Sequence, residues 1–349
     1  MAFKATGGRF SGAGTGGPDT TGSDDRATNS LDWLEPTAYI PNFNGAARLS
    51  VLLTSLRRQT HECQVVVVDN GSSDDSVGIV RERFPEVSVF ELPRNLGFGK
   101  ALNLAIAEHR GDPVLLLNND VECEPGFIGE MLAALGPEVE MVAGVLTNRD
   151  DPTVIDSAGV VADRRTLMAF DYLHDEPVES ARQAPPPLAP TGGAALYRLE
   201  SFESIGGFDE RIFAYYEDLD LALRLRVAGA RCALAPDARA SHLHSATLGS
   251  RSASKYALTG WSRGYLARRY GILKSPVAAA RTLFWEAIIC AGQIVLDRTF
   301  SGTTGRIRGW RAGKSLPTRT LPANGLLELS TRTVIGSRIR QRESVGTSL

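Results

Sequence analysis

The sequence predicts an α/β fold in which a mostly parallel sheet is flanked by helices, and two observations indicate it. Between residues 37 and 120, short apolar runs alternate four times with amphipathic segments. Residues 64–68 form a continuous β-branched run, as in a strand that is buried on both faces. Since strands that alternate with helices usually lie parallel, helices are expected on both faces of the sheet.

The expected elements follow in order along the chain. A short strand at residues 39–40 precedes a helix in which Leu49, Leu52, Leu53 and Leu56 recur at helical spacing. Next come a strand at 64–68, a helix at about 74–84, a strand at 87–92, a helix at 100–108 and a strand at 114–117. Residues 147–190 are rich in Asp, Pro and Ala and predict a long excursion with a mobile loop.

Regular structure is expected again after this excursion. A run at residues 194–197 predicts a strand, and Leu219, Leu223 and Val227 predict one apolar face of a helix that starts near Glu217. Two short strands are expected at residues 232–234 and 238–244.

The composition is that of a globular protein with unevenly distributed charge. The 349 residues carry 38 Lys and Arg against 40 Asp and Glu, so the net charge of −2 gives no reason to expect nucleic acid as a partner. Residues 251–349 hold 17 basic and 4 acidic side chains, whereas residues 1–250 hold 21 basic and 36 acidic ones, so an acidic body is followed by a basic C-terminal part. The four cysteines lie far apart, which excludes a disulfide scaffold and a structural zinc site and favours a cytoplasmic setting.

Composition divides the chain into three expected parts: residues 1–35, 36–255 and 256–349. The first is rich in glycine and poor in large apolar side chains, which predicts a disordered tail. Its glycines at 12, 14, 16 and 17 superficially suggest a phosphate loop, but no apolar strand pattern precedes them. The segment also lacks the apolar core of a signal peptide, so no export is expected. The other two parts are the sheet domain and a basic helical extension.

A long helix is expected in the basic extension. Ser275 and Pro276 have the pattern of a helix cap and first turn. An apolar stripe follows at helical spacing, formed by Val277, Ala280, Phe284, Ile288, Ala291 and Val295. Cations flank the helix, Arg306, Arg308 and Arg311 among them, and an apolar face between cations suits an anionic lipid surface. The alternative is a helical hairpin packed on the sheet domain. A membrane span is not expected, because the apolar stretch 282–296 is shorter than the roughly 20 residues that a span requires.

Polar side chains follow three predicted strands. Residues 41–44, the pair Asp69 and Asn70, and residues 118–120 each come directly after an apolar run. In open α/β sheets, ligands lie beyond the carboxyl ends of the strands, so these side chains are expected to converge. Each one alone is also compatible with an ordinary turn.

A fourth polar feature strengthens this expectation. Glu217, Asp218 and Asp220 start a predicted helix, where acids can cap the helix and complement its dipole. Asp220 and Arg224 have the spacing of an ion pair within one helix. Because one cap does not require three carboxylates, a chemical role is expected for the others.

Five motifs in fixed order resemble a known family. They are VVVVDNGSSDDS, LPRNLGFGKALNLAI, LLLNND, GGFDERIFAYYEDLDLALRLRVAG and HLHSATLGS. Over residues 37–262 the chain resembles family 2 inverting glycosyltransferases of the GT-A fold, in the subgroup that includes bacterial rhamnosyltransferases. The resemblance implies that an acceptor hydroxyl displaces a nucleoside diphosphate from the anomeric carbon of a nucleotide sugar. The Gln-x-x-Arg-Trp signature of processive synthases does not occur, so one sugar per encounter is expected.

The resemblance also implies the contacts of the nucleotide sugar. Asp69 corresponds to the acid that accepts a hydrogen bond from the pyrimidine base, a role that suits a carboxylate. The other implied contacts are Pro41, Asn44, Asn70, Asn95, Gly97, Asn103, Asn119 and Gly193. The pair at 192 and 193 resembles the segment beneath donor and acceptor, although a simple turn is also compatible with it.

The implied metal site and acids come from the remaining motifs. Residues 118–120 occupy the place of the family's Asp-x-Asp motif, with asparagine first, so Asp120 is implied to bind Mg²⁺ or Mn²⁺. His242 is implied as a further ligand, with a structural hydrogen bond as the alternative, and His244 is a weaker candidate. Asp218 corresponds to the catalytic general base and Glu217 to a supporting residue.

These implications together predict a metal-dependent inverting glycosyltransferase of cell-envelope or exopolysaccharide synthesis. The expected donor is dTDP-rhamnose first and a UDP-sugar second, and the expected acceptor is a glycan or a polyprenyl-diphosphate-linked sugar. The basic extension predicts a cytoplasmic protein held peripherally at the inner face of the membrane. A sugar-nucleotide pyrophosphorylase would need a Gly-rich loop ending in Arg, which residues 41–44 do not supply. A catalytically silent nucleotide-sugar or glycan-binding protein stays open, since it needs Asp69 but not Asp218.

Overall fold

The computed structural model describes residues 35–242 and 252–329. The expectations for the glycine-rich tail up to residue 34 and for His244 lie outside the described residues.

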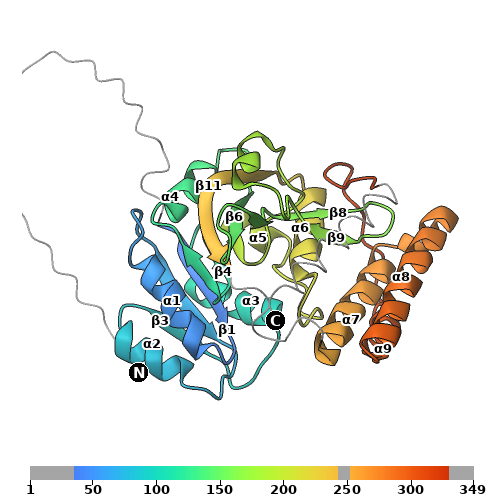
Figure 1. Ribbon diagram of the computed structural model, residues 1–349, viewed down its shortest axis with the longest axis horizontal. Helices are drawn as coiled ribbons and strands as arrows, with labels where there is room; N and C mark the ends of the chain where they lie inside the picture. Colours follow the sequence, from blue (N-terminus) through green and yellow to red (C-terminus); the bar gives the residue numbers. More distant parts are fainter. Residues whose placement is uncertain (1–34, 243–251, 330–349) are drawn as a thin grey trace, which may run out of the picture. The chain divides into compact units, whose positions relative to one another are not determined.

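The first half of the sheet has the expected alternating order (Figure 1). Its elements are β1 (Thr37–Asn42), α1 (Ala46–Leu56), β2 (Gln64–Asp69), α2 (Ser76–Arg83), β3 (Ser88–Glu91), α3 (Phe98–His109) and β4 (Val114–Leu117). The strands lie in the order β3, β2, β1, β4 and all pair in parallel. The four leucines of α1 are buried, as their spacing predicts.

The second half of the sheet is mixed. Its elements are β5 (Val121–Cys123), α4 (Phe127–Ala133), β6 (Met141–Asn148), β7 (Ile155–Ser157), β10 (Ala194–Tyr197), α5 (Leu199–Ser204), α6 (Glu217–Val227) and β11 (Cys232–His242). β10 is antiparallel to its neighbours β4 and β6, and β11 is parallel to β6 and antiparallel to β5. The two short strands expected before residue 244 are one strand, β11. Its pairing with β6 shifts register between Leu234 and Arg239, around Pro236, which has no N–H to donate.

The excursion at residues 147–190 carries more regular structure than its composition predicts. Besides β7 it contains β8 (Val160–Ala162), β9 (Ala169–Asp171) and the 3₁₀ helix η1 (Val178–Gln183), and β8 pairs with β9 in a separate small sheet. Met168 and Phe170 are buried with Trp285 of the C-terminal extension. The sequence did not predict this structure, because single apolar residues between Asp and Pro show no helical or strand period, even where they are buried, as Met168 and Phe170 are.

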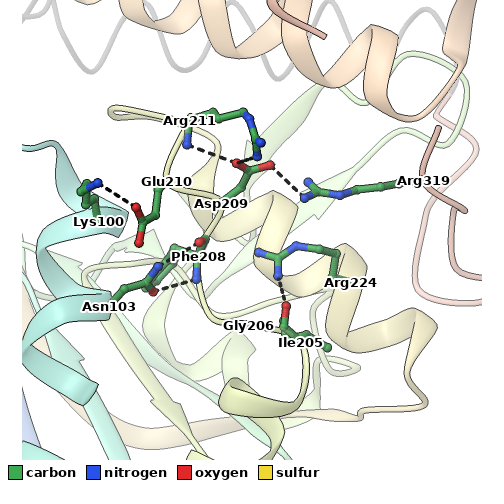
Figure 2. Close-up of a pocket in the computed structure, with 10 residues that line it drawn as sticks. All are labelled: Lys100, Asn103, Ile205, Gly206, Phe208, Asp209, Glu210, Arg211, Arg224 and Arg319. Atoms are coloured by element: carbon green, nitrogen blue, oxygen red, sulfur yellow. Dashed lines mark hydrogen bonds and ion pairs between the residues drawn. The ribbon is translucent and has the colours of Figure 1, made fainter. Parts of the chain in front are cut away.

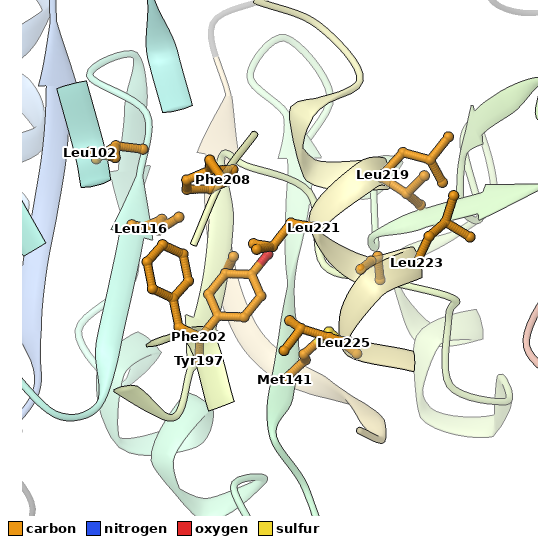
Figure 3. Close-up of a cluster of buried hydrophobic side chains, with 14 of the residues drawn as sticks. Leu102, Leu116, Met141, Tyr197, Phe202, Phe208, Leu219, Leu221, Leu223 and Leu225 are labelled. Carbon is orange, nitrogen blue, oxygen red and sulfur yellow. The ribbon is translucent and has the colours of Figure 1, made fainter. Parts of the chain in front are cut away.

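A cluster of buried side chains holds α6 on the sheet. Figure 3 shows Tyr197, Phe202 and Phe208 beside the leucines of this helix. Leu219 and Leu223 are fully buried as expected, whereas Val227, at the end of the helix, is 48% exposed. This packing fixes the helix whose first turn carries the three acids.

The basic extension is helical, as expected. It consists of α7 (Ala253–Arg269), the 3₁₀ helix η2 (Ile272–Lys274), α8 (Pro276–Leu296) and α9 (Ser301–Ala312). The Ser275 side chain caps α8 by accepting from the Ala278 N–H. Helices α7 and α9 approach closely, because a Cβ atom at Gly264 would lie only 2.0 Å from the Arg306 carbonyl oxygen.

Helix α8 is longer than the apolar stretch from which it was expected. Its 21 residues begin at Pro276, and it is the one helix among the described residues that is long and apolar enough to cross a membrane. The expectation that the stretch is too short was therefore wrong, because small residues before Thr282 extend the helix. One face packs on the body through Thr282 and Trp285, whereas Phe284 and Val295 of the stripe are 57% and 73% exposed.

Candidate active site

Sheet pairing brings the predicted polar side chains to one edge. β1, β2 and β4 are parallel, so their carboxyl ends meet there. Because β10 is antiparallel to β4, its beginning, next to Gly193, reaches the same edge, and the Asn118 N–H donates to the Gly193 carbonyl at 3.4 Å. His242 at the end of β11 pairs with Val121, directly after Asp120.

Asp69 is buried at this edge in a chain of polar side chains. Its carboxylate accepts from Asn42 Nδ2 at 3.1 Å and from the Ser72 N–H at 3.0 Å. Asn119 Nδ2 in turn donates to Asn42 Oδ1 at 2.8 Å. Asn42 thus links the ends of three strands. It lies in the 41–44 segment that was expected to converge here, but no role was predicted for it. The contact between Asn42 and Asp69 follows from the register of β1 and β2, which sets these two residues opposite each other.

Three of the predicted nucleotide contacts shape the neighbouring loop. Asn70 Nδ2 donates to the Gly97 carbonyl at 3.1 Å, and its Oδ1 accepts from the Leu96 N–H at 2.8 Å. Asn95 Oδ1 accepts from the Gly97 N–H at 2.9 Å. Gly97 has φ +90°, and a Cβ there would lie 2.6 Å from the Phe213 carbonyl oxygen, so only glycine fits. These residues hold the loop against the segment that precedes α6.

Asn44 and Pro41 lie at the end of β1 and just beyond it. Asn44 has φ +51°, and its Oδ1 accepts from the backbone N–H groups of Ser73 at 2.8 Å and Asp74 at 3.3 Å. Pro41 is half-buried and pairs with Val68. Asn44 thus binds the loop that follows β2.

Asn103 has a different position from the other predicted contacts. It donates to the Phe208 carbonyl at 3.0 Å and accepts from the Phe208 N–H at 2.9 Å. It also lines a cavity of about 580 Å³ with Lys100 and Arg211 (Figure 2). Of the predicted site residues, Asn103 alone lines this cavity.

Asp120 and His242 come together as predicted for a metal pair. His242 Nε2 lies 3.5 Å from Asp120 Oδ1, and its Nδ1 lies 2.7 Å from Asp156 Oδ2. Burial lowers the pKa of His242, but the hydrogen bonds that its ring donates to Asp120 and Asp156 and the charge of these carboxylates outweigh burial and raise this pKa to about 10. Asp156, at the centre of β7, was missed because it lies in the excursion that was expected to be irregular.

The described side chains form no group of three His, Cys, Asp or Glu residues that could hold a metal. Asp120 Oδ1 is nevertheless buried, and among the described residues its partner is His242 Nε2 at the long distance of 3.5 Å. A buried carboxylate oxygen of this kind fits a divalent cation that takes its remaining ligands from phosphate and water. Asn118, the first residue of the motif, lies beside Gly193, where a Cβ would be 3.2 Å from its Nδ2.

The two acids at the start of α6 differ in environment. Glu217 is buried and Asp218 is half-buried. Burial first, and then the charge of Asp218, raise the pKa of Glu217 to about 8. Burial and the charge of Asp171 raise the pKa of Asp218, while hydrogen bonds from the Leu219 and Gly192 N–H groups oppose this shift. Tyr215 and Tyr216 precede the acids with φ +68° and +71°, a costly backbone that turns the helix start toward the edge.

The glycine pair thus has an acid on one side and the predicted metal motif on the other. Gly192 faces the Asp218 carboxylate through its N–H, and Gly193 contacts Asn118. Glu217 Oε2 and the Tyr197 hydroxyl are buried without hydrogen-bond partners among the described residues. The arrangement leaves polar groups beside a strip of backbone without side chains.

Comparisons with known proteins identify the family. Residues 37–206 match the sequence model described as "Glycosyl transferase family 2". N-acetylglucosaminyl-diphospho-decaprenol L-rhamnosyltransferase of Mycobacterium tuberculosis is 30% identical over 243 residues, which cover 62% of this chain and 78% of that protein. The chain belongs to glycosyltransferase family 2. A second relative of this glycosyltransferase, the pre-mycofactocin glycosyltransferase of the same species, is 28% identical over 90% of this chain and 65% of its own length.

Solved structures support the GT-A fold of this family 2 glycosyltransferase. The mannosyltransferase PcManGT of Pyrobaculum calidifontis, in complex with GDP-Man and Mn²⁺, aligns with a TM-score of 0.50 and 18% identity over 90% of this chain and 84% of its own. GalNAc-T7 with UDP, GalNAc and Mn²⁺ aligns with a TM-score of 0.52 and 14% identity over 66% of this chain and 48% of its own.

The raised pKa of Glu217 predicts a pH-dependent stability. The folded protein keeps a proton up to about pH 8 that the unfolded chain loses above its ordinary value of 4.5, so the free energy of unfolding should fall across this range. Glu217→Gln should remove this loss of stability. Between pH 5 and pH 8, its free energy of unfolding should rise by about 1–4 kcal/mol relative to that of wild type. Unfolding by denaturant at pH 5 and at pH 8 measures this difference in free energy. Glu200 is exposed, so Glu200→Gln is the control. Parallel pH dependence in wild type and Glu217→Gln would contradict the prediction.

Proposed function

We propose that this glycosyltransferase is inverting and moves one sugar per encounter from a nucleotide diphosphate sugar to an acceptor hydroxyl of a cell-envelope glycan or polyprenyl-linked sugar. The observation that carries the proposal is the position of Gly192 and Gly193 between Asp218 and the 118–120 motif. A donor sugar on this strip has an acid on the acceptor side and a cation-binding carboxylate on the diphosphate side, as in-line displacement requires.

The nucleotide would bind across the ends of β1, β2 and β4. Asp69, held by Asn42, is suited to accept a hydrogen bond from the imide N–H of thymine or uracil. The first donor to test is dTDP-rhamnose, because the relative that is 30% identical is named as an L-rhamnosyltransferase. UDP-sugars come second.

Asp218 would remove the proton of the acceptor hydroxyl during the attack on the anomeric carbon. Its raised pKa makes it a stronger base than an ordinary aspartate, and partial exposure gives the acceptor access. Glu217, buried next to it, would orient the acceptor side of the site.

Asp120 and His242 would hold Mg²⁺ or Mn²⁺ beside the diphosphate, with His242 oriented by Asp156. When bound, such an ion neutralises the charge that develops on the leaving diphosphate. The hydrogen bond of Nδ1 to Asp156 turns Nε2 toward Asp120, and Nε2 has to release the proton that the raised pKa of His242 keeps on it before it can act as a ligand.

Asp218→Asn should abolish turnover while the nucleotide still binds. The asparagine cannot accept the hydroxyl proton, so kcat should fall by about 10³-fold or more. Turnover with the donor series and calorimetry with dTDP, UDP and GDP, each with Mn²⁺ or EDTA, measure the two effects. Exposed Asp150→Asn is the control. Undiminished turnover in Asp218→Asn would contradict the role of base, and a silent binding protein would give no turnover in wild type.

Asp156→Asn should weaken metal binding. An amide orients the imidazole less well and adds no negative charge, so Mn²⁺ affinity should fall about 10–100-fold. Titration of the purified protein with Mn²⁺, followed by the paramagnetic resonance of the free ion, gives this affinity without an activity assay. Asp237→Asn, a carboxylate that pairs with Arg182 at the surface, is the matched control. Equal affinities of wild type and Asp156→Asn would count against the site.

We also propose that the exposed face of α8 lies on an anionic membrane surface. Phe284, Ile288 and Val295 are exposed on one stripe, and Arg308 and Arg311 of α9 are exposed after it. Arg306 was expected in this set, but its guanidinium is buried against Glu286 at 2.5 Å and serves the helix packing instead.

The double variant Phe284→Ser and Ile288→Ser should bind anionic vesicles less tightly. Two apolar side chains are lost from the contact, so sedimentation with phosphatidylglycerol vesicles should weaken about tenfold or more. Leu104→Ser on α3, which is 39% exposed in wild type, is the matched control. Binding of the double variant at wild-type strength, or equal binding to phosphatidylcholine vesicles, would exclude the proposed surface.

A further inference from the structure

The segment that carries the two acids is anchored at both ends by buried aspartates. Asp209 precedes it and Asp220 lies in the first turn of α6, and their side chains are 1% and 0% exposed. An ionised carboxylate at such depth is costly unless cations and hydrogen-bond donors surround it. The partners of these two aspartates therefore decide whether the segment keeps its conformation.

One arginine from the far end of the chain bridges both aspartates. Arg319, which follows α9, donates from Nη2 to Asp209 Oδ2 at 2.8 Å and from Nη1 to Asp220 Oδ1 at 2.5 Å. Figure 2 shows its side chain reaching Asp209 along one side of the cavity. A planar guanidinium suits this double contact, because its donors point in fixed directions.

Helix α7 and the residue directly after it supply a second partner for each aspartate. The Tyr265 hydroxyl donates to Asp209 Oδ2 at 2.7 Å, and the Tyr270 hydroxyl, just after α7, donates to Asp220 Oδ1 at 2.9 Å. Arg224 of α6 donates to Asp220 Oδ2 at 2.8 Å, and Arg211 donates to Asp209 Oδ1 from its backbone N–H at 3.1 Å and from Nη1 at 3.4 Å. Three of these five partner residues thus belong to the C-terminal extension.

The backbone between the two anchors is strained and makes further contacts with α7. Tyr215 and Tyr216 both have positive φ, a conformation that is costly for residues with a side chain and persists only where the surroundings impose it. The Ser262 hydroxyl donates to the Ala214 carbonyl at 3.3 Å, and the Arg263 guanidinium lies 5.6 Å from the centre of the Tyr216 ring. If the contacts of Asp209 and Asp220 were lost, the backbone at Tyr215 and Tyr216 would be expected to change to a less costly conformation.

We propose that Arg319 is a positioning residue for the reaction, which acts through Asp209 and Asp220 to hold Glu217 and Asp218 against the Gly192 and Gly193 strip. The inference rests on the proposed function, in which Asp218 is the base. Arg319 itself does not touch the substrate. It fixes the turn that presents the acids, and the C-terminal extension is therefore part of the catalytic domain.

Arg319→Gln tests this role with two readouts. We expect kcat to fall about 10–100-fold with the donor KM changed less than threefold, because the nucleotide binds at the ends of β1, β2 and β4. We also expect the amide hydrogens of residues 210–219 to exchange at least tenfold faster. Arg319→Lys should give an intermediate kcat, since an ammonium group keeps the charge but reaches one carboxylate at a time.

The matched control is Arg164→Gln. Arg164 binds the carbonyls of Pro322 and Ala323, and so holds the same C-terminal stretch without touching either aspartate. It should leave kcat and the exchange of residues 210–219 at wild-type values. Equal effects in Arg164→Gln and Arg319→Gln would overturn the proposal, because attachment of the stretch and not the carboxylate bridge would then matter.

Wild-type kcat and wild-type exchange in folded Arg319→Gln would also overturn it. If Arg319→Gln does not fold, Tyr265→Phe, which removes one hydrogen bond to Asp209, decides by the same two readouts. Hydrogen exchange separates this proposal from the proposed function. If hydrogen exchange is faster in Arg319→Gln but turnover is at the wild-type level in Asp218→Asn, then Arg319 positions the segment but Asp218 is not the base.

Discussion

The parallel pairing of β1, β2 and β4 is the constraint on which the site depends. It brings the polar residues at and just beyond the carboxyl ends of these strands to one edge, which is where ligands bind in open α/β sheets. The antiparallel β10 then brings Gly193 between them and the start of α6. Residues far apart in the sequence, such as Asn42 and Asn119, thereby come into direct contact.

Buried carboxylates at the start of α6 are a second feature on which the site depends. The acids at the start of α6 are partly removed from water, which raises the pKa of both Glu217 and Asp218 and makes the second a better proton acceptor. Asp220, two residues later, has different neighbours, because two arginines and a tyrosine donate hydrogen bonds to it. One short helix therefore holds carboxylates of different chemistry, set by what packs around each.

Much of the fold and part of the site could be predicted from the sequence. Residues 114–117 are a strand as expected, and the spacing of the leucines in α1 gave its buried face, because local period reports burial. The pairing of Asp220 with Arg224 was likewise readable from helical spacing. Asn42, Asp156 and Arg319 were not accessible in this way. Their roles depend on strand register and on contacts between distant segments, which no local pattern encodes.

The bridge made by Arg319 bears on where this chain can be cut. Similarity to the family model ends at residue 206, and composition changes near residue 255, so either point invites a shortened catalytic fragment. A fragment that ends at residue 206 would lack Asp218 and the whole of α6. A fragment that ends near residue 255 would lack Tyr265, Tyr270 and Arg319, and Asp209 and Asp220 would lose most of the groups that compensate their burial. Removing one partner of a buried ion pair alone costs about 3–5 kcal/mol, a large share of the stability of a typical domain. The segment that sequence similarity recognises is thus smaller than the smallest piece that can be expected to fold, and chimaeras between relatives need to exchange the extension together with the loop it holds.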